Sequence, residues 1–173
     1  MGTSRGSLGT TPAHWPSTAI SIGLSTVGIV SVLLMTRWGI GTSVDSVAYI
    51  QAARALTGGS GEAVLVQHAP LYSFLLAAGG VLGLDPIDGA RWLNALTCGA
   101  NIFLVGLLIR RTATNLPWLW VLGSTLMLVL VPMLIIHVTA LSEPVFLTCT
   151  LAGFWLLARH FESPTSGRLL MSA

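Results

Sequence analysis

Five apolar runs alternate with short polar segments along the chain, and their lengths predict a helical membrane protein. The runs cover residues 18–36, 71–84, 92–109, 118–138 and 144–158. A helix rises about 1.5 Å per residue, so crossing about 30 Å of hydrocarbon takes about 20 residues, with about 17 as a lower bound. The runs 71–84 and 144–158 are shorter than this bound. We predict an all-α, polytopic membrane protein with about four transmembrane helices and external juxtamembrane helices.

Arginines predict which ends of the spans face the cytoplasm, because cytoplasmic loops near membrane spans carry an excess of Arg and Lys. Arg110 and Arg111 follow the third run directly, and Arg159 follows the last run. Arg5 and Arg168 agree with the same side. We therefore predict a multi-pass protein of the cell membrane whose N-terminus and C-terminus are both cytoplasmic.

This orientation leaves residues 38–90 as the first external loop. The run 71–84 within it has the length expected of an interfacial or re-entrant helix. If residues 71–84 crossed the membrane instead, Arg110 and Arg111 would lie outside, against the charge rule. The run 18–36 is too long for the apolar core of a signal peptide and has no small-residue cleavage site after it, so we expect an uncleaved anchor behind a polar tail, residues 1–17.

Composition narrows the function. Charged residues make up only 8% of the chain, against roughly 25% in soluble domains. All eight basic residues are arginine, which excludes P-loop NTPases, pyridoxal phosphate enzymes and Schiff-base chemistry, since each needs a lysine. The net charge of +2 does not suggest a nucleic-acid surface. Cys98 and Cys149 fall inside apolar runs and are expected to be small core residues; no metal-ligand spacing or cofactor motif is present.

Two acidic residues are candidates for chemistry. Asp45 opens "DSVAYIQAARAL", which has helical spacing and predicts a short helix at the membrane surface. Glu143 precedes Pro144, which favours a place at the start of the last span. Each acid could simply cap its helix. However, acids at membrane depth cost roughly 2.5–3.5 kcal/mol and are usually functional. The predicted topology puts both on the external face, where they could meet.

Other polar side chains accompany these acids. In "QHAPLYSFLLA", His68 is either solvated at the end of a loop or a hydrogen-bond donor to a phosphate or sugar hydroxyl, and Tyr72 follows closely. His137 precedes Glu143 and could join it, although a lone histidine near an interface is more often incidental. A polar stripe recurs every three or four positions along the third run and must face other helices or a cavity; its members are Arg91, Asn94, Cys98 and Asn101.

For the two asparagines of this stripe we favour hydrogen bonds between helices. Arg91 stands at the outer end of its span, where it could extend its charge into the interface or bind a lipid phosphate.

The order of "SVDSVAYIQAARALTGGSG", "HAPLYSFLLAAGGVLGLDPIDGARWLNAL", "RR" and "HVTALSEPVFL" resembles the N-terminal part of bacterial GT-C glycosyltransferases related to the protein mannosyltransferases and aminoarabinose transferases. The resemblance covers roughly residues 30–159. It implies an enzyme that transfers one sugar from a polyprenyl-phosphate donor at the external membrane face.

The resemblance also implies roles for residues. Asp45 would be the base that deprotonates the acceptor, and Glu143 would line the same pocket. Many relatives carry an Asp-Glu pair where this chain has Asp45 and Ser46, and two prolines where it has Ala69 and Pro70. Cationic groups must hold the leaving phosphate, and the external candidates are Arg54, Arg91 and Arg37.

Relatives of this kind have more spans, so we expect residues 18–160 to be a GT-C-like N-terminal module and residues 161–173 a truncated cytoplasmic tail. The expected partners are membrane lipid, a polyprenyl-phosphate sugar donor and a second membrane chain. The alternative is a non-catalytic module or pseudoenzyme that binds a lipid-linked sugar or packs against a partner chain.

Overall fold

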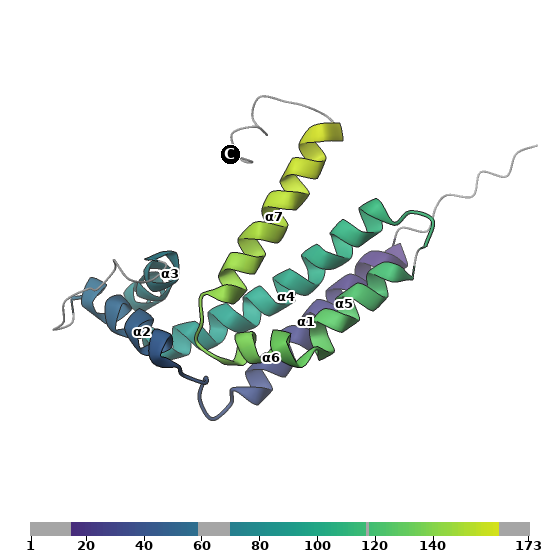
Figure 1. Ribbon diagram of the computed structural model, residues 1–173. Helices are drawn as coiled ribbons and strands as arrows, with labels where there is room; N and C mark the ends of the chain where they lie inside the picture. Colours follow the sequence, from purple (N-terminus) through teal and green to yellow (C-terminus); the bar gives the residue numbers. More distant parts are fainter. Residues whose placement is uncertain (1–14, 59–69, 117, 163–173) are drawn as a thin grey trace, which may run out of the picture.

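The computed structural model describes residues 15–58, 70–116 and 118–162, which form seven helices (Figure 1). The helices are α1 (Trp15–Met35), α2 (Val44–Leu56), α3 (Pro70–Val81), α4 (Pro86–Thr112), α5 (Leu119–Val129), α6 (Val131–Val138) and α7 (Glu143–Glu162). The described part contains no strand, only an isolated bridge between Gly41 and Thr139. The predicted all-α class is confirmed.

Within the described part of the chain, three helices are long and apolar enough to cross a membrane: α1 (from Ser17), α4 and α7. Large apolar side chains on them stay uncovered by protein, including Leu34 on α1 and Phe146 and Phe154 on α7. Such side chains are expected to face lipid, because a helix that is apolar on its outer surface is not stable in water. The chain is therefore a helical membrane protein.

The fourth apolar run, residues 118–138, differs from the prediction of a single helix. It is divided into α5 and α6, which meet at a bend of 55°. Leu130 is extended at the bend, and Pro132 stands in the first turn of α6. Proline lacks the N–H that would bond to Leu128 and its ring clashes with that carbonyl, so the helix cannot continue straight. The pair counts as a fourth span only if the bent helix crosses as a whole.

Helix α4 is the centre of the bundle, with α1, α5 and α7 packed along it (Figure 1). Close approach depends on glycine. A Cβ added at Gly99 would lie 2.6 Å from Ile29 and 3.1 Å from the Ser25 carbonyl oxygen of α1. A Cβ at Gly106 would lie 2.8 Å from Ser124 Oγ of α5. Small residues at helix interfaces are the usual route to tight packing in membranes.

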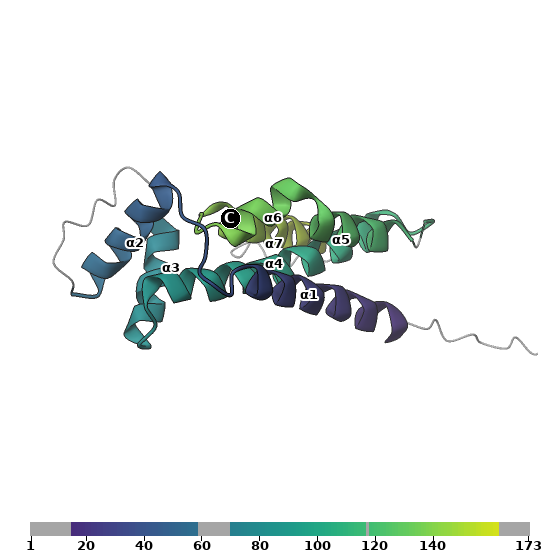
Figure 2. The ribbon, with the colours of Figure 1, turned by 90° about the horizontal axis from the view of Figure 1, so that it is seen from below.

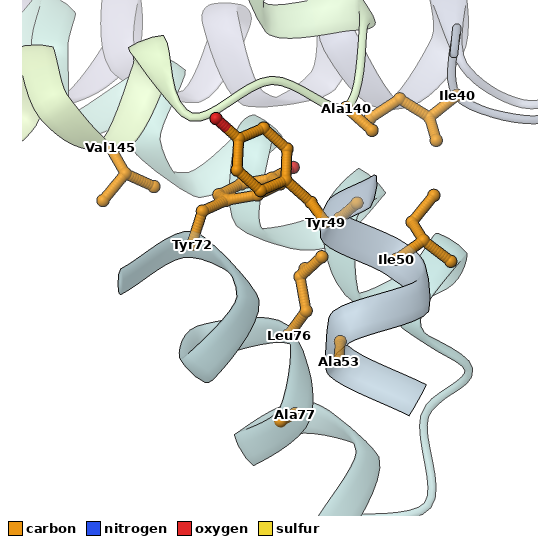
Figure 3. Close-up of a cluster of buried hydrophobic side chains, with 10 residues drawn as sticks. Ile40, Tyr49, Ile50, Ala53, Tyr72, Leu76, Ala77, Ala140 and Val145 are labelled. Atoms are coloured by element: carbon orange, nitrogen blue, oxygen red, sulfur yellow. The ribbon is translucent and has the colours of Figure 1, made fainter. Parts of the chain in front are cut away.

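Helices α2 and α3 form a short pair beside the first turns of α4 (Figures 1 and 2). The predicted short helix after Gly41 is thus confirmed as α2. Helix α3 has 12 residues, about 18 Å of helix, which is too short to cross the hydrocarbon. The pair is held by a buried apolar cluster that includes Tyr49, Tyr72 and Leu76 (Figure 3).

The long helices place their ends in two groups. The end of α1 is joined to the end of α6, since Gly41 N donates to Val138 O (2.8 Å) and Ala140 N donates to Gly41 O (2.8 Å). The starts of α2, α4 and α7 lie at this same end (Figure 1). The arginine-bearing ends of α4 and α7 lie at the other. Asp45 and Glu143 therefore share one end of the bundle, and which end faces the cytoplasm stays a prediction.

Candidate functional site

A pocket of about 430 Å³ lies between α3 and the first turns of α7. Its lining is mainly apolar and consists of Leu71, Tyr72, Ser142, Glu143, Val145, Phe146 and Cys149. Its volume falls in the range typical of small-molecule sites, roughly 300–1,000 Å³. We call it the Glu143 pocket.

Glu143 is the first residue of α7 and, among the described residues that line the pocket, the one that carries a charge. Its side chain is exposed, while Pro144 and Val145 behind it are buried. The helix begins here because Pro144 fits a first-turn position, where no N–H is required. The positive end of the helix dipole stabilises a carboxylate at this point. Glu143 thus offers hydrogen-bond acceptors at the edge of an apolar cavity.

Tyr72 forms the inner wall of the pocket and is fixed from two sides. Its hydroxyl donates to Asn94 Oδ1 of α4 (3.1 Å), and Tyr49 packs edge-on against its ring, with centroids 5.2 Å apart (Figure 3). Burial, followed by the electrostatic influence of Tyr49 and Glu143, raises the pKa of the Tyr72 phenol above its usual value of 10.0. Tyr72 is therefore protonated at neutral pH and acts as a donor.

Asp45 lies in the first turn of α2 with an exposed side chain, and it is not part of the lining of the Glu143 pocket. The N-cap of α2 is Ser43. Its Oγ accepts from Ser46 N (3.2 Å), and Ser43 N donates to Ser46 Oγ (2.9 Å). Ser43, two residues before Asp45, is therefore the N-cap residue of α2, and Asp45 stands in the first turn, where its charge is favourable to the helix dipole.

Tyr49, one turn further along α2 than Asp45, connects this helix to the edge of the pocket. Tyr49 Oη lies 3.0 Å from Ser142 Oγ, and Ser142 immediately precedes Glu143. Neither residue stood out in the sequence. The spacing of four residues between Asp45 and Tyr49 could have indicated that the two side chains lie on the same face of a helix, one turn apart.

Two of the three arginines that were candidates for binding phosphate, Arg54 and Arg91, have partners within the protein. Arg54 forms an ion pair with Asp85 (3.1 Å), which also caps α4 by accepting from Ile87 N. Arg91 donates to Leu33 O (3.1 Å) and to Thr36 Oγ1 (3.3 Å), so it satisfies the last turn of α1. Neither arginine lines the Glu143 pocket.

Arg37 is exposed at the end of α1, where its guanidinium stacks on Trp38 at 5.3 Å from the ring centroid. His68 lies outside the described residues.

The expected hydrogen bonds between helices are confirmed for both asparagines. Asn94 Nδ2 donates to Thr139 O (2.6 Å). Asn101 Nδ2 lies 3.2 Å from both Pro144 O and His137 Nε2, and its Oδ1 accepts from Thr148 Oγ1 (2.8 Å). His137 Nδ1 must donate to the Met133 carbonyl oxygen (2.6 Å), so Nε2 is the acceptor for Asn101. The two ring nitrogens of His137 are thus engaged in the bundle core.

The two cysteines differ. Cys98 is buried in the core beside Val32 and Ile102, as expected. Cys149 is exposed and lines the Glu143 pocket, so the expectation that it is a core residue is wrong. Its position in an apolar run gave no sign of which side of α7 it would occupy. Among the described residues no three His, Cys, Asp or Glu side chains gather closely enough to hold a metal ion.

Comparisons of the chain with protein-family models, with curated proteins and with solved structures give no match. The resemblance to GT-C glycosyltransferases therefore stays a prediction from the residues quoted above, and function has to be argued from the site itself.

Proposed function

We propose that this chain contributes to a site that transfers a monosaccharide from a polyprenyl-phosphate donor to an acceptor at the external membrane face, with both termini in the cytoplasm. The observation that carries the proposal is the Glu143 pocket: one carboxylate at the edge of an apolar cavity, at the end of the bundle that also bears Asp45. Apolar walls with a few placed polar groups are typical of small-molecule sites. Such a lining suits a prenyl-linked sugar, whose hydroxyls can donate to Glu143.

The transfer itself needs a base and a stabilised leaving group. In the proposed step the acceptor attacks the anomeric carbon, Asp45 takes the acceptor's proton, and the bond to the donor oxygen breaks with its electron pair leaving on the phosphate. A positioned base contributes roughly 10²–10⁴ in rate. At the end of the bundle that bears Asp45, Arg37 is exposed and forms no ion pair with a described acid. We therefore propose that Arg37 binds the phosphate of the donor.

The test is sugar transfer in membranes that contain the protein, measured with a radiolabelled polyprenyl-phosphate sugar. Asp45→Asn should lower the rate by about 100-fold or more, because an amide cannot take a proton. The matched control is Asp88→Asn, which changes an equally exposed acid in the first turn of α4 at the same end. Transfer by Asp45→Asn within about threefold of wild type would remove Asp45 from the mechanism.

A second candidate function is favoured by one specific observation. Asp45 does not line the Glu143 pocket, so the pocket taken alone lacks the base that we propose for transfer. A non-catalytic module would bind a lipid-linked sugar through Glu143 and tolerate Asp45→Asn. Binding of a prenyl-linked sugar that is lost in Glu143→Gln but kept in Asp45→Asn, with no transfer by wild type, would support this module.

A further inference from the structure

The end of the bundle opposite the Glu143 pocket carries arginines held against tryptophans. The guanidinium of Arg110 lies 5.5 Å from the ring centroid of Trp120 on α5, and that of Arg159 lies 4.8 Å from the ring of Trp155. Cations stacked on aromatic faces keep a fixed position at low entropic cost. These side chains are therefore placed before any ligand arrives.

A second pocket, of about 320 Å³, lies at this end between the last turns of α4 and α7. It is lined by Leu107, Arg110, Arg111, Trp155 and Glu162. Leu107 and Trp155 supply an apolar side, and the charged residues supply a polar one. We call it the Arg110 pocket.

The two arginines of the Arg110 pocket differ in their partners. Arg111 forms an ion pair with Glu162 and donates to Ala158 O (2.9 Å), so its charge is neutralised within the protein. Arg110 forms no ion pair with any acid that the structure describes. Its guanidinium contacts the face of Trp120, which leaves N–H donors for another group.

A simpler explanation is that both arginines stabilise the negative end of the α4 helix dipole. This explanation accounts for positive charge in the last turn of α4. It does not explain why a cavity lies between the two helices, with a guanidinium on one side and the apolar side chains of Leu107 and Trp155 on the other. That combination matches an amphiphile with an anionic head.

The location points to the same class of ligand. The Arg110 pocket lies at the ends of α4 and α7, two helices that are long enough to cross the membrane. Such helix ends lie at the interface between lipid and water, where Trp and Arg side chains are common. Basic pockets between transmembrane helices bind anionic lipid head groups. We propose that the Arg110 pocket binds the phosphate of an anionic membrane lipid, with the lipid chain along Leu107 and Trp155. This proposal does not depend on sugar transfer.

The experiment uses the full chain in nanodiscs that contain phosphatidylcholine with a minor fraction of phosphatidylglycerol, followed by native mass spectrometry of the lipids retained. Wild type should retain phosphatidylglycerol in preference to phosphatidylcholine. Arg110→Gln should lower this preference by about tenfold, because a charge-assisted bond to phosphate is lost. The matched control is Arg54→Gln, which removes an exposed arginine that is already paired with Asp85, at the opposite end and outside both pockets.

Three results would overturn the proposal. The first is equal retention of the two lipids by wild type. The second is an unchanged preference in Arg110→Gln, or an equal loss in Arg54→Gln. The third is displacement of phosphatidylglycerol by millimolar inorganic phosphate, which would mean that the pocket takes free phosphate rather than a lipid. If Arg110→Gln does not fold, Arg110→Lys keeps the charge and should still prefer phosphatidylglycerol, though more weakly than wild type; no preference in a folded Arg110→Lys would also overturn the proposal.

Discussion

The hydroxyl of Tyr49 on α2 lies 3.0 Å from the hydroxyl of Ser142, the residue that precedes Glu143. This bond joins two parts of the chain 93 positions apart. It connects α2, which carries Asp45 in its first turn, to the segment that leads into α7 and the Glu143 pocket. The relative position of the two acids therefore depends on it.

The Tyr49–Ser142 pair should behave as one energetic unit. Tyr49→Phe and Ser142→Ala should each lower the free energy of unfolding by about 0.5–1.5 kcal/mol, the usual net contribution of a hydrogen bond. The double variant should lose much less than the sum, since the second change removes a partner of a bond already gone. Denaturant unfolding of the purified protein in detergent measures this cycle. Strictly additive losses would contradict a direct bond.

Thr148 offers a test of the Asn101 network with an internal control. Thr148 Oγ1 donates to Asn101 Oδ1 (2.8 Å) and contacts Pro144 O, whereas Thr150 Oγ1 bonds only to Phe146 O in its own helix. Thr148→Val should therefore lower the free energy of unfolding by about 1 kcal/mol more than Thr150→Val. Thermal unfolding followed by circular dichroism measures the difference, and equal losses would show that the bond between helices contributes nothing.

Tyr72 predicts a change of stability at alkaline pH. Its pKa is raised in the folded state, mainly by burial, so the folded protein holds the phenolic proton more tightly than the unfolded chain does. Its contribution is fully present below the usual tyrosine pKa of about 10 and is lost as the pH rises above that value. Tyr72→Phe should remove this dependence, leaving a shallower fall of stability above pH 10. Unfolding midpoints measured from pH 8 to pH 11 give the comparison, and identical profiles would contradict it.

The predicted sidedness can be measured by cysteine labelling in intact cells. Because Cys149 is exposed in the Glu143 pocket, it must first be replaced by serine, whereas buried Cys98 can stay. In that background Ser142→Cys should react with a membrane-impermeant maleimide from outside. Thr112→Cys, at the arginine-bearing end, should react only after the cells are permeabilised. Labelling of Thr112→Cys from outside would reverse the orientation and move the Glu143 pocket to the cytoplasm.

Patterns local in sequence predicted most of the fold. The long apolar runs gave α1 and α4 because length against bilayer thickness is a strong constraint. The asparagines of α4 were predicted to bond between helices because lipid offers no other partner. The break before α6 was missed, although Pro132 signals it, because the apolar run continues through the bend without a polar residue.

The site was less predictable because it depends on pairs far apart in the chain. The ion pair of Arg54 with Asp85 and the bonds of Arg91 to α1 turn two candidate phosphate ligands into connections between helices. No spacing in the sequence shows such pairings, since they depend on how α2 and α1 pack against α4. The capping motif that begins at Ser43 is, by contrast, local in sequence and could have been predicted from Ser43 and Ser46 alone.

The bend at Leu130 has a mechanical consequence for the pocket. The extended Leu130 and Pro132 in the first turn of α6 turn the chain by 55° away from the axis of α5. Helix α6 leads within a few residues to Ser142 and Glu143, so the direction that the chain takes at Leu130 decides where α7 begins. Bonds from Asn94 to Thr139 O and from Asn101 to Pro144 O hold this segment against α4 on both sides of Glu143, so the width of the cavity between Glu143 and Tyr72 is fixed by the bend and by α4 together.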